Sequence, residues 1–167
     1  MKTLITYATN HGCTEKTALK LNDFLGGTAQ LINLKENSNP DLTDYERIII
    51  GGSIHAGRIQ KTIKKFCEQH KNELMKKELG LFICCMEEGE KAQIQFNDAF
   101  QEVLRQNAKA SACLGGEFDF EKMTAFQRMI IKKVAKVEHN TSRVDYEAIR
   151  QFSTKMDKVF NPFLFLV

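Results

Sequence analysis

The order of apolar and polar residues along the chain shows two alternating patterns. Five short stretches are apolar at most positions, which is typical of strands; they are Thr3–Ala8, Ala29–Leu34, Arg47–Gly51, Leu79–Met86 and Ser111–Gly115. The third and fourth stretches read RIIIG and LGLFICCM and, apart from Arg47, are apolar throughout. Strands that are buried on both faces have this composition, as in a parallel sheet covered by helices.

Four further stretches place apolar residues three or four positions apart, as one face of an amphipathic helix requires. Their apolar positions are Ala18, Leu21 and Leu25; Ile63, Phe66, Cys67, His70 and Leu74; Phe96, Phe100, Val103 and Leu104; and Ile149, Phe152, Met156 and Val159. Gly26-Gly27 and Asn161-Pro162 end the first and the last of these predicted helices. The polar segment of residues 35–46 is too short for a full helix.

Strands and helices that alternate in this way predict an α/β fold with a parallel sheet and right-handed crossovers. For five strands we expect a doubly wound sheet in the order 2-1-3-4-5, within one domain over residues 1–167. In such sheets, ligands bind beyond the carboxyl ends of the strands, between strands one and three. The sequence that follows the first strand is therefore the first candidate for a binding site.

The composition is that of an ordinary globular protein, with 43% apolar and 27% charged residues. A net charge of +3, without an arginine-rich run, argues against nucleic-acid binding. The five cysteines form no CxxC pair and no zinc-ligand spacing, so we expect reduced thiols, no bound metal and a cytoplasmic location. The sequence contains neither a signal-peptide pattern nor an apolar run as long as a membrane span.

The segment YATNHGCTEKT joins the first strand to the first predicted helix. A helix that starts at this point offers unpaired amide groups and the positive end of its dipole to a phosphate. Thr9, Asn10 and Thr14 add neutral donors, and Gly12 permits a tight turn. The loop has neither the GxGxxG of dinucleotide sites nor the GxxxxGK[ST] of triphosphate sites, so a terminal monophosphate is the expected ligand. The alternative is a polar turn that is capped by Thr9 or Asn10 and binds nothing.

This loop, TNHGCT, is similar to the phosphate-loop signature of flavodoxins, (Ser/Thr)-x-Thr-Gly-x-Thr, with His11 in place of the middle threonine. The replacement removes one hydroxyl and puts an imidazole in its position. The opening MKTLI, the segment DYERIIIGGSIHAGRI and the segment FQRMIIKKVAK resemble, more specifically, the menaquinone-dependent protoporphyrinogen oxidases. These are flavodoxin-fold FMN enzymes of bacterial haem synthesis, and the likeness spans most of the chain.

The resemblance implies a flavodoxin-like sheet and an FMN site made of three loops. The expected phosphate loop is Thr9, Asn10, His11, Gly12, Cys13 and Thr14. Two loops would hold the isoalloxazine ring, namely Ser53, Ile54, His55, Ala56 and Gly57 after strand three, and Cys84, Cys85, Met86, Glu87 and Gly89 after strand four. Neither loop contains Trp or Tyr, so His55 is the only planar side chain that these loops offer to stack on the ring. The segment GGSIHAG is otherwise an ordinary strand-ending turn, and the glutamates a solvated charge run.

Residues 117–140 do not fit the five-strand plan and form an insertion after strand five, where long-chain flavodoxins also carry one. Its apolar residues recur at helical spacing, at Met123, Phe126, Ile130, Val134 and Val137. Its basic residues are Arg128, Lys132, Lys133 and Lys136. A basic amphipathic helix of this kind suits an anionic membrane surface or an acidic substrate. Alternatively, its apolar face packs on the domain. The terminal segment NPFLFLV is a second apolar element, at a surface or buried.

Two functions remain open. In the first, FMN takes electrons from an organic substrate, which the resemblance implies is protoporphyrinogen IX, and passes them to a quinone at the inner face of the membrane. Arg58 and the basic residues of the insertion would then contact substrate or membrane, whereas no residue is identified as catalytic. In the second, the protein is a one-electron carrier between redox proteins. The net positive charge favours the enzyme, because carriers of this type usually have an acidic face. A flavodoxin-like interaction domain without cofactor is a third option, against which the intact loop argues.

Overall fold

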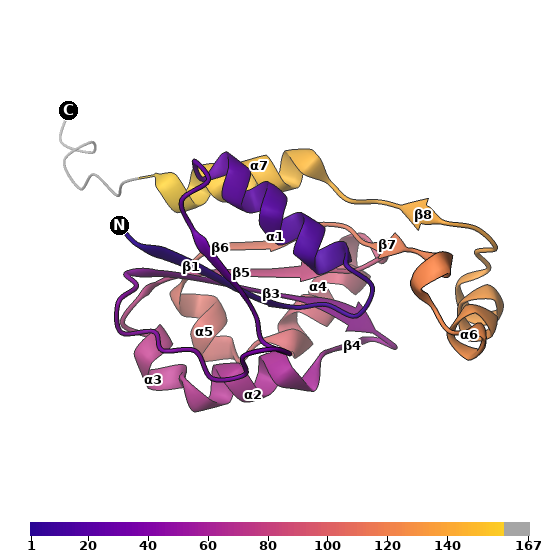
Figure 1. The fold of residues 1–167 in the computed structure, drawn as a ribbon, viewed down its shortest axis with the longest axis horizontal. Helices are drawn as coiled ribbons and strands as arrows, with labels where there is room; N and C mark the ends of the chain where they lie inside the picture. The colour runs from indigo at the N-terminus through magenta and orange to yellow at the C-terminus, as the bar shows by residue number, and fades with distance from the viewer. Residues whose placement is uncertain (159–167) are drawn as a thin grey trace.

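The computed structural model describes residues 1–158, in which five parallel strands form the centre of the molecule (Figure 1). In their spatial order they are β2 (Gln30–Asn33), β1 (Thr3–Ala8), β3 (Arg47–His55), β5 (Glu78–Cys84) and β6 (Ala108–Cys113). This is the predicted order 2-1-3-4-5, and the α/β fold class is confirmed. A sixth strand, β4 (Arg58–Ile59), pairs antiparallel with β3 and was not predicted.

The sheet is buried on both faces. Successive side chains of a strand point to opposite faces, so neighbours in β3 belong to different cores. Ile48 and Ile50 pack with Leu81 on one face, whereas Ile49 packs with Phe82 on the other. These residues are fully buried. The continuous apolar runs in the sequence have this double burial as their cause.

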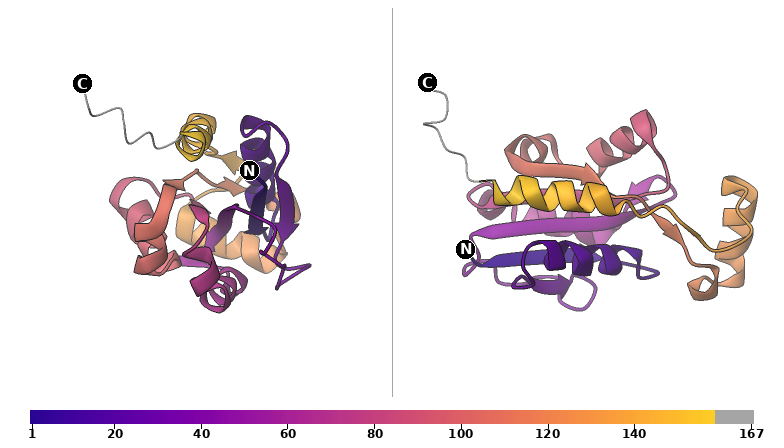
Figure 2. Two further views of the ribbon diagram at one scale, coloured as in Figure 1. Left: turned by 90° about the vertical axis from the view of Figure 1, so that its left-hand side faces the viewer. Right: turned by 90° about the horizontal axis from the view of Figure 1, so that it is seen from above.

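Two layers of helices cover the sheet (Figure 1; Figure 2). One face carries α1 and α7, and the other carries α2 to α5. Their bounds are α1 (Cys13–Phe24), α2 (Lys61–Gln69), α3 (Lys71–Leu74), α4 (Gly89–Ala99), α5 (Glu102–Asn107) and α7 (Tyr146–Asp157). Residues 34–46 form turns and extended segments without a helix, as expected for this short crossover.

Two of the predicted helical stripes are divided in the structure. The second stripe is split between α2 and α3 at His70, and the third is split between α4 and α5 at Phe100. Phe100 is extended (φ −123°, ψ 140°), yet its ring stays buried 5.3 Å from that of Phe96. The packing face is therefore kept although the helix is interrupted. Val159 and the segment NPFLFLV lie outside the described residues.

The insertion projects beyond the carboxyl ends of the parallel strands (Figure 1; Figure 2). It consists of β7 (Glu117–Phe118), the short 3-10 helix η1 (Phe120–Lys122), α6 (Ala125–Ala135) and β8 (Thr141–Ser142), and β7 pairs antiparallel with β8. Thr124 caps α6 in a capping box with Gln127, and Lys136 ends it in a left-handed conformation. Among residues 1–158, no helix is both long enough and apolar enough to cross a membrane.

Candidate functional site

The turn between β1 and α1 presents free backbone amides. Gly12 is the residue before α1 and has a φ of 91°, a conformation that L side chains rarely adopt. Within residues 1–158, no side chain caps α1. The first amides of a helix have no partner inside the helix, and the helix dipole makes this end positive. The turn is therefore suited to bind an anion.

The polar side chains of this turn have partners other than the helix. The amide of Gly12 donates to Thr9 Oγ1 at 2.9 Å, which tightens the turn. Lys35, at the end of β2, donates to Asn10 Oδ1. The capped turn that the sequence left open, with Thr9 or Asn10 as cap, is therefore wrong. In the described part of the chain, the buried hydroxyl of Thr14 makes no hydrogen bond of good geometry, although it lies near the Cys84 thiol and acts to lower the pKa of that group.

The end of β3 is tied to the end of β1 by Gln60. Its side-chain amide donates to the carbonyl of Ala8 at 3.1 Å and accepts from the amide of Ser53 at 2.9 Å. The hydroxyl of Ser53 is hydrogen-bonded to His55 Nε2 at 2.9 Å. β3 continues to His55 instead of ending at Gly51. The expected loop is thus mostly strand, and only Ala56 and Gly57, both with positive φ, form the turn into β4.

His55 is a neutral imidazole next to a second histidine. The rings of His55 and His11 meet edge to face at 62°, with centroids 5.8 Å apart. Loss of solvent around the ring lowers the pKa of His55 to about 4, and electrostatic repulsion from the neighbouring His11 and Lys35 acts in the same direction. At neutral pH, His55 is therefore a hydrogen-bonding group without charge.

The loop after β5 brings buried thiols to the site. The thiol of Cys84 donates to Thr17 Oγ1 at 3.5 Å, and that of Cys85 donates to the carbonyl of Glu87 at 3.5 Å. Contact with Cys13, together with burial, raises the pKa of Cys84 well above its usual value. Contact with Cys113 and burial likewise raise the pKa of Cys85. Both groups therefore remain neutral thiols. The glutamates of the loop, Glu87, Glu88 and Glu90, are exposed.

The insertion closes the space between these three loops. A side chain at Gly116 would lie 2.7 Å from the carbonyl carbon of Cys85, so the insertion leaves the sheet in close contact with the third loop. His11 Nε2 contacts Gln127 Oε1 of α6 at 3.4 Å. Together the loops and the insertion enclose a cavity of about 230 Å³. Its walls are mostly apolar, and Phe118 and Met123 contribute to them.

Comparison with known proteins identifies the family. The model of the family described as "Flavodoxin domain" matches residues 4–145 of this chain. The chain belongs to the flavodoxin-domain family. Within this family, the start of α1 beside the carboxyl ends of β1 and β3 is the candidate site.

Three similar proteins place the chain more closely. It is 24% identical over 171 residues to protoporphyrinogen IX dehydrogenase (quinone) of Escherichia coli strain K12, with 93% of this chain and 94% of that protein covered. It is 23% identical to the protein of the same name from Leishmania major, over 92% of this chain and 73% of that one. The structure of oxidised Flavodoxin 2 from Bacillus cereus matches with a TM-score of 0.58 at 20% identity, over 93% and 97% of the two chains. The last similarity confirms the flavodoxin-like fold.

The structure of this flavodoxin-domain protein brings most of the predicted site residues together. The cavity is lined by Thr9, His11, Cys13, Ser53, Ile54, His55, Ala56, Cys84, Cys85 and Met86. Six other predicted residues lie in the same loops but outside the cavity wall, namely Asn10, Gly12, Thr14, Gly57, Glu87 and Gly89. The cofactor-binding roles of both groups of residues stay predictions.

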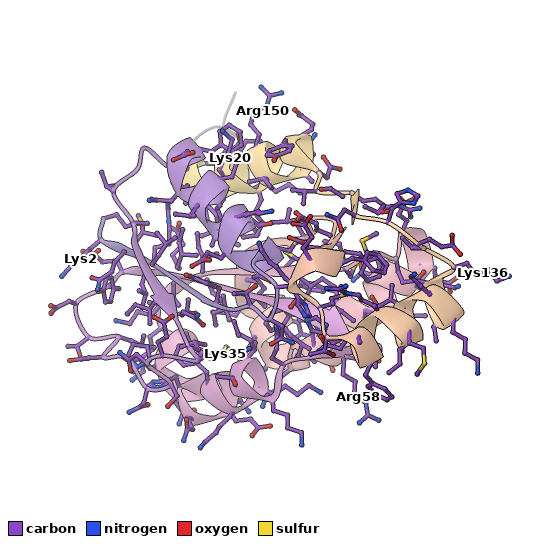
Figure 3. The ribbon with its side chains drawn as sticks, turned by 45° about the vertical axis from the view of Figure 1, so that its right-hand side comes forward. Lys2, Lys20, Lys35, Arg58, Lys136 and Arg150 are labelled. Carbon is purple, nitrogen blue, oxygen red and sulfur yellow. The ribbon has the colours of Figure 1, made fainter. Side chains whose placement is uncertain are left out.

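The predicted substrate or membrane contacts lie outside the cavity. Arg58 is exposed on β4, and Figure 3 shows it and Lys136 directed outward. Arg128, Lys132 and Lys133 are exposed on α6. None of the 11 described residues of α6 is buried, and Phe126 and Val134 are 66% and 77% exposed. The apolar face of this helix is therefore divided: Ile130 and Ile131 line the cavity beside the domain, whereas Phe126 and Val134 face solvent.

The sequence prediction missed the part of the cavity wall that the insertion supplies. These residues are Gly116, Glu117, Phe118, Met123, Gln127, Ile130 and Ile131. Phe118 gives the site the aromatic side chain that the two ring loops lack. The alternation in EFDF is a strand signal that points to β7. No local pattern, however, shows that this strand folds back beside the third loop.

Proposed function

We propose that this flavodoxin-domain protein is an FMN-dependent oxidoreductase that oxidises an organic substrate and passes the electrons to a quinone. Protoporphyrinogen IX is the proposed substrate. The observation that carries the proposal is the apolar cavity at the start of α1, because the insertion gives it a wall that a simple electron carrier does not need. The names of the Escherichia coli and Leishmania major relatives support the same chemistry.

The residues at the start of α1 fit a phosphate monoester. Gly12 leaves the helix without a side-chain cap, and the buried hydroxyl of Thr14 lacks a partner within residues 1–158. Buried polar groups rarely stay unsatisfied, so this hydroxyl is a group that a phosphate would complete. We propose that Thr9–Thr14 hold the FMN phosphate. His11 would replace the missing hydroxyl of the flavodoxin signature.

The cavity fits the isoalloxazine ring of the same cofactor. Its walls combine apolar side chains with neutral hydrogen-bonding groups, among them Ser53, His55 and the thiol of Cys84. When bound there, FMN supplies reversible transfer of one or two electrons, and the protein supplies binding and orientation. Phe118 offers a flat apolar surface to the ring. Neutral His55 and Ser53 would hydrogen-bond to it without adding charge.

The surroundings of the cavity suit a large apolar substrate that carries carboxylates. Exposed Arg58, Arg128 and Lys132 supply positive charge outside an apolar cavity. Protoporphyrinogen IX combines an apolar macrocycle with two propionates, and its oxidation to the porphyrin removes six electrons, which three two-electron turnovers of the flavin would transfer. We assign no catalytic residue, because the flavin carries the electron chemistry.

Anaerobic turnover tests this function directly. The full chain is purified, loaded with FMN and mixed with protoporphyrinogen IX and a menaquinone analogue, while porphyrin fluorescence is followed. We expect fluorescence to rise with quinone consumption, at a rate proportional to the amount of bound FMN. Protein without FMN is the control. A failure to bind FMN after reconstitution would reject the whole scheme, and bound FMN without turnover would reject the enzyme.

A one-electron carrier is the second candidate. The exposed glutamates Glu87, Glu88 and Glu90 next to the third loop favour it, because a local acidic surface can dock a basic redox partner. In the turnover assay, a carrier would hold FMN without oxidising protoporphyrinogen IX. Fast, salt-sensitive exchange of single electrons with a basic cytochrome would then identify it.

Peripheral attachment to the cytoplasmic face of a membrane is part of the proposal. The exposed apolar side chains of α6, including Phe126 and Val134, lie on the same short helix as Lys132 and Lys133. Helices with this distribution bind the interface of anionic bilayers. A quinone dissolved in the bilayer would then meet the protein on the side where the cavity lies.

A further inference from the structure

One lysine of the insertion reaches back to the proposed phosphate loop. The amine of Lys122 lies 3.3 Å from the position that a Cβ atom of Gly12 would take. The ammonium group therefore sits directly over the backbone of the turn, in space that the absent side chain leaves open. The insertion thus touches the start of α1 in addition to lining the cavity.

Buried neighbours hold the backbone of Lys122 in place. Phe120 and Met123, on either side of it, are 9% and 7% exposed. The amide of Phe120 donates to Asn140 Oδ1 at 2.8 Å, and Asp119 accepts from the amide of Glu121 at 3.1 Å. The position of the lysine is therefore built into the insertion and does not depend on the ammonium group alone.

Other charged side chains, of both signs, lie near the same turn. Lys35 donates to Asn10, and Lys16 forms an ion pair with Glu117 at 2.9 Å. Lys122 itself pairs with Asp119 at 3.4 Å. Three lysines thus lie near the turn, together with the carboxylates of Glu117 and Asp119 and that of Glu15 in the first turn of α1.

The turn has one donor fewer than the flavodoxin signature provides. His11 replaces a threonine, which removes a hydroxyl from the loop. At the same place the buried hydroxyl of Thr14 has no partner in the described residues, and α1 has no side-chain cap. These observations together indicate an anion site that the loop alone does not complete.

We propose that Lys122 is a phosphate-binding residue, whose ammonium group neutralises the terminal phosphate of FMN from the side of the insertion. The inference rests on the proposed function, because it takes FMN as the ligand. A charge-assisted hydrogen bond from this lysine compensates for the hydroxyl that is missing at His11. As a result, the insertion contributes both to the phosphate site and to the wall of the cavity.

Comparison of FMN with riboflavin isolates the phosphate. Binding of each flavin to the full-length apoprotein is measured by quenching of flavin fluorescence. We expect Lys122→Gln to weaken FMN binding about tenfold to a hundredfold, which is the range for one charge-assisted contact. Riboflavin lacks the phosphate, so its affinity is expected to stay unchanged. Increasing salt should reduce the difference in FMN affinity between the wild type and the variant.

Lys20→Gln is the matched control. Like Lys122, Lys20 pairs with an aspartate three residues away, Asp23 at 3.8 Å, and its side chain is 41% exposed against 49% for Lys122. Lys20 lies on α1 but away from the turn (Figure 3). We expect this variant to bind both flavins as the wild type does. Equal loss in the two lysine variants would show a general charge effect and overturn the proposal.

The remaining outcomes also decide the matter. If Lys122→Gln weakens the binding of FMN and of riboflavin equally, the lysine has a structural role. If it weakens the binding of neither flavin, the lysine does not contact the phosphate. Both results overturn the proposal, but the proposed function stands as long as the wild type binds FMN. Failure of the wild type to bind FMN would overturn both. If Lys122→Gln does not fold, Asp119→Asn replaces it as the test. Removal of the competing carboxylate should tighten FMN binding but not riboflavin binding, and unchanged FMN affinity would reject Lys122.

Discussion

Single residues at the carboxyl ends of β3 and β5 keep part of the cavity wall uncharged. The pKa of His55 is lowered to about 4, and those of Cys84 and Cys85 are raised. Near neutral pH, all three groups are therefore neutral. A flat, uncharged ring can bind against a wall of this kind without the cost of desolvating a charged side chain. Cys13 in the same wall differs, because its hydrogen bond with Cys84 lowers the pKa of its thiol.

The lowered pKa of His55 predicts a loss of stability in weak acid. In the unfolded chain a histidine takes up its proton near pH ~6.5, whereas His55 in the native state does so at about 4. Between these values the unfolded state binds more protons, so the free energy of unfolding falls as the pH is lowered. The ring keeps contact with solvent, which limits the size of the effect.

Urea unfolding of His55→Gln tests this dependence. We expect the wild type to lose more stability than the variant between about pH 7 and about pH 5, because glutamine does not titrate. His139→Gln, at an exposed position of the insertion, is the control. Parallel pH profiles for wild type and His55→Gln would contradict the prediction.

Among the elements, α6 differs from every other long helix because it buries none of its residues. Phe126, Met129 and Val134 are more than half exposed, at 66%, 57% and 77%. Such a face on a helix is commonly covered by a partner or a membrane. We propose an anionic bilayer as that partner, because Lys132 and Lys133 are exposed on the same helix.

Vesicle sedimentation tests this role of α6. We expect the protein to sediment with vesicles that contain phosphatidylglycerol but not with pure phosphatidylcholine. Reversal of one charge, as in Lys132→Glu, should weaken binding at least about fivefold, since each basic residue near the surface contributes ~1 kcal/mol. Phe126→Ser should weaken it as well. Tyr146→Ser is the control, because it removes a comparably exposed aromatic side chain, 61% exposed on α7, and it should not change vesicle binding. If all variants bind vesicles as the wild type does, α6 does not attach the protein to the membrane.

The elements also show how far the sequence could be interpreted. Strands β1, β3 and β5 were predictable because burial on both faces leaves few polar positions in them. The interruption at Phe100 was not, because apolar periodicity records which side chains share a face and does not record a break in the backbone. The apolar pattern of the insertion did indicate α6. The position of α6 beside the turn after β1 depends instead on contacts distant in sequence, such as that between Gln127 and His11.

At the scale of the whole molecule, the chain enters and leaves the insertion at neighbouring positions. The amide of Arg143 donates to the carbonyl of Gly116 at 2.8 Å, so the chain leaves and re-enters the sheet region at neighbouring positions. Beyond this point, β7 and β8 pair with each other and not with the central sheet. The two cores on either face of the sheet include no residue from 117–142. The sheet with its helices therefore contains its own packing.

This construction predicts that the insertion can be removed without unfolding the protein. Residues 117–142 are replaced by a two-residue Asn-Gly turn, which suits the short distance between Gly116 and Arg143. We expect the free energy of unfolding, measured with urea, to stay within about 1 kcal/mol of that of the parent protein, because neither core loses a residue. FMN binding should weaken about tenfold with the loss of Lys122, and porphyrinogen oxidation should fall about a hundredfold as the cavity opens to water. Flavin titration and the anaerobic turnover assay measure the two effects, and parental turnover in the shortened protein would mean that the central sheet and its loops form the complete site.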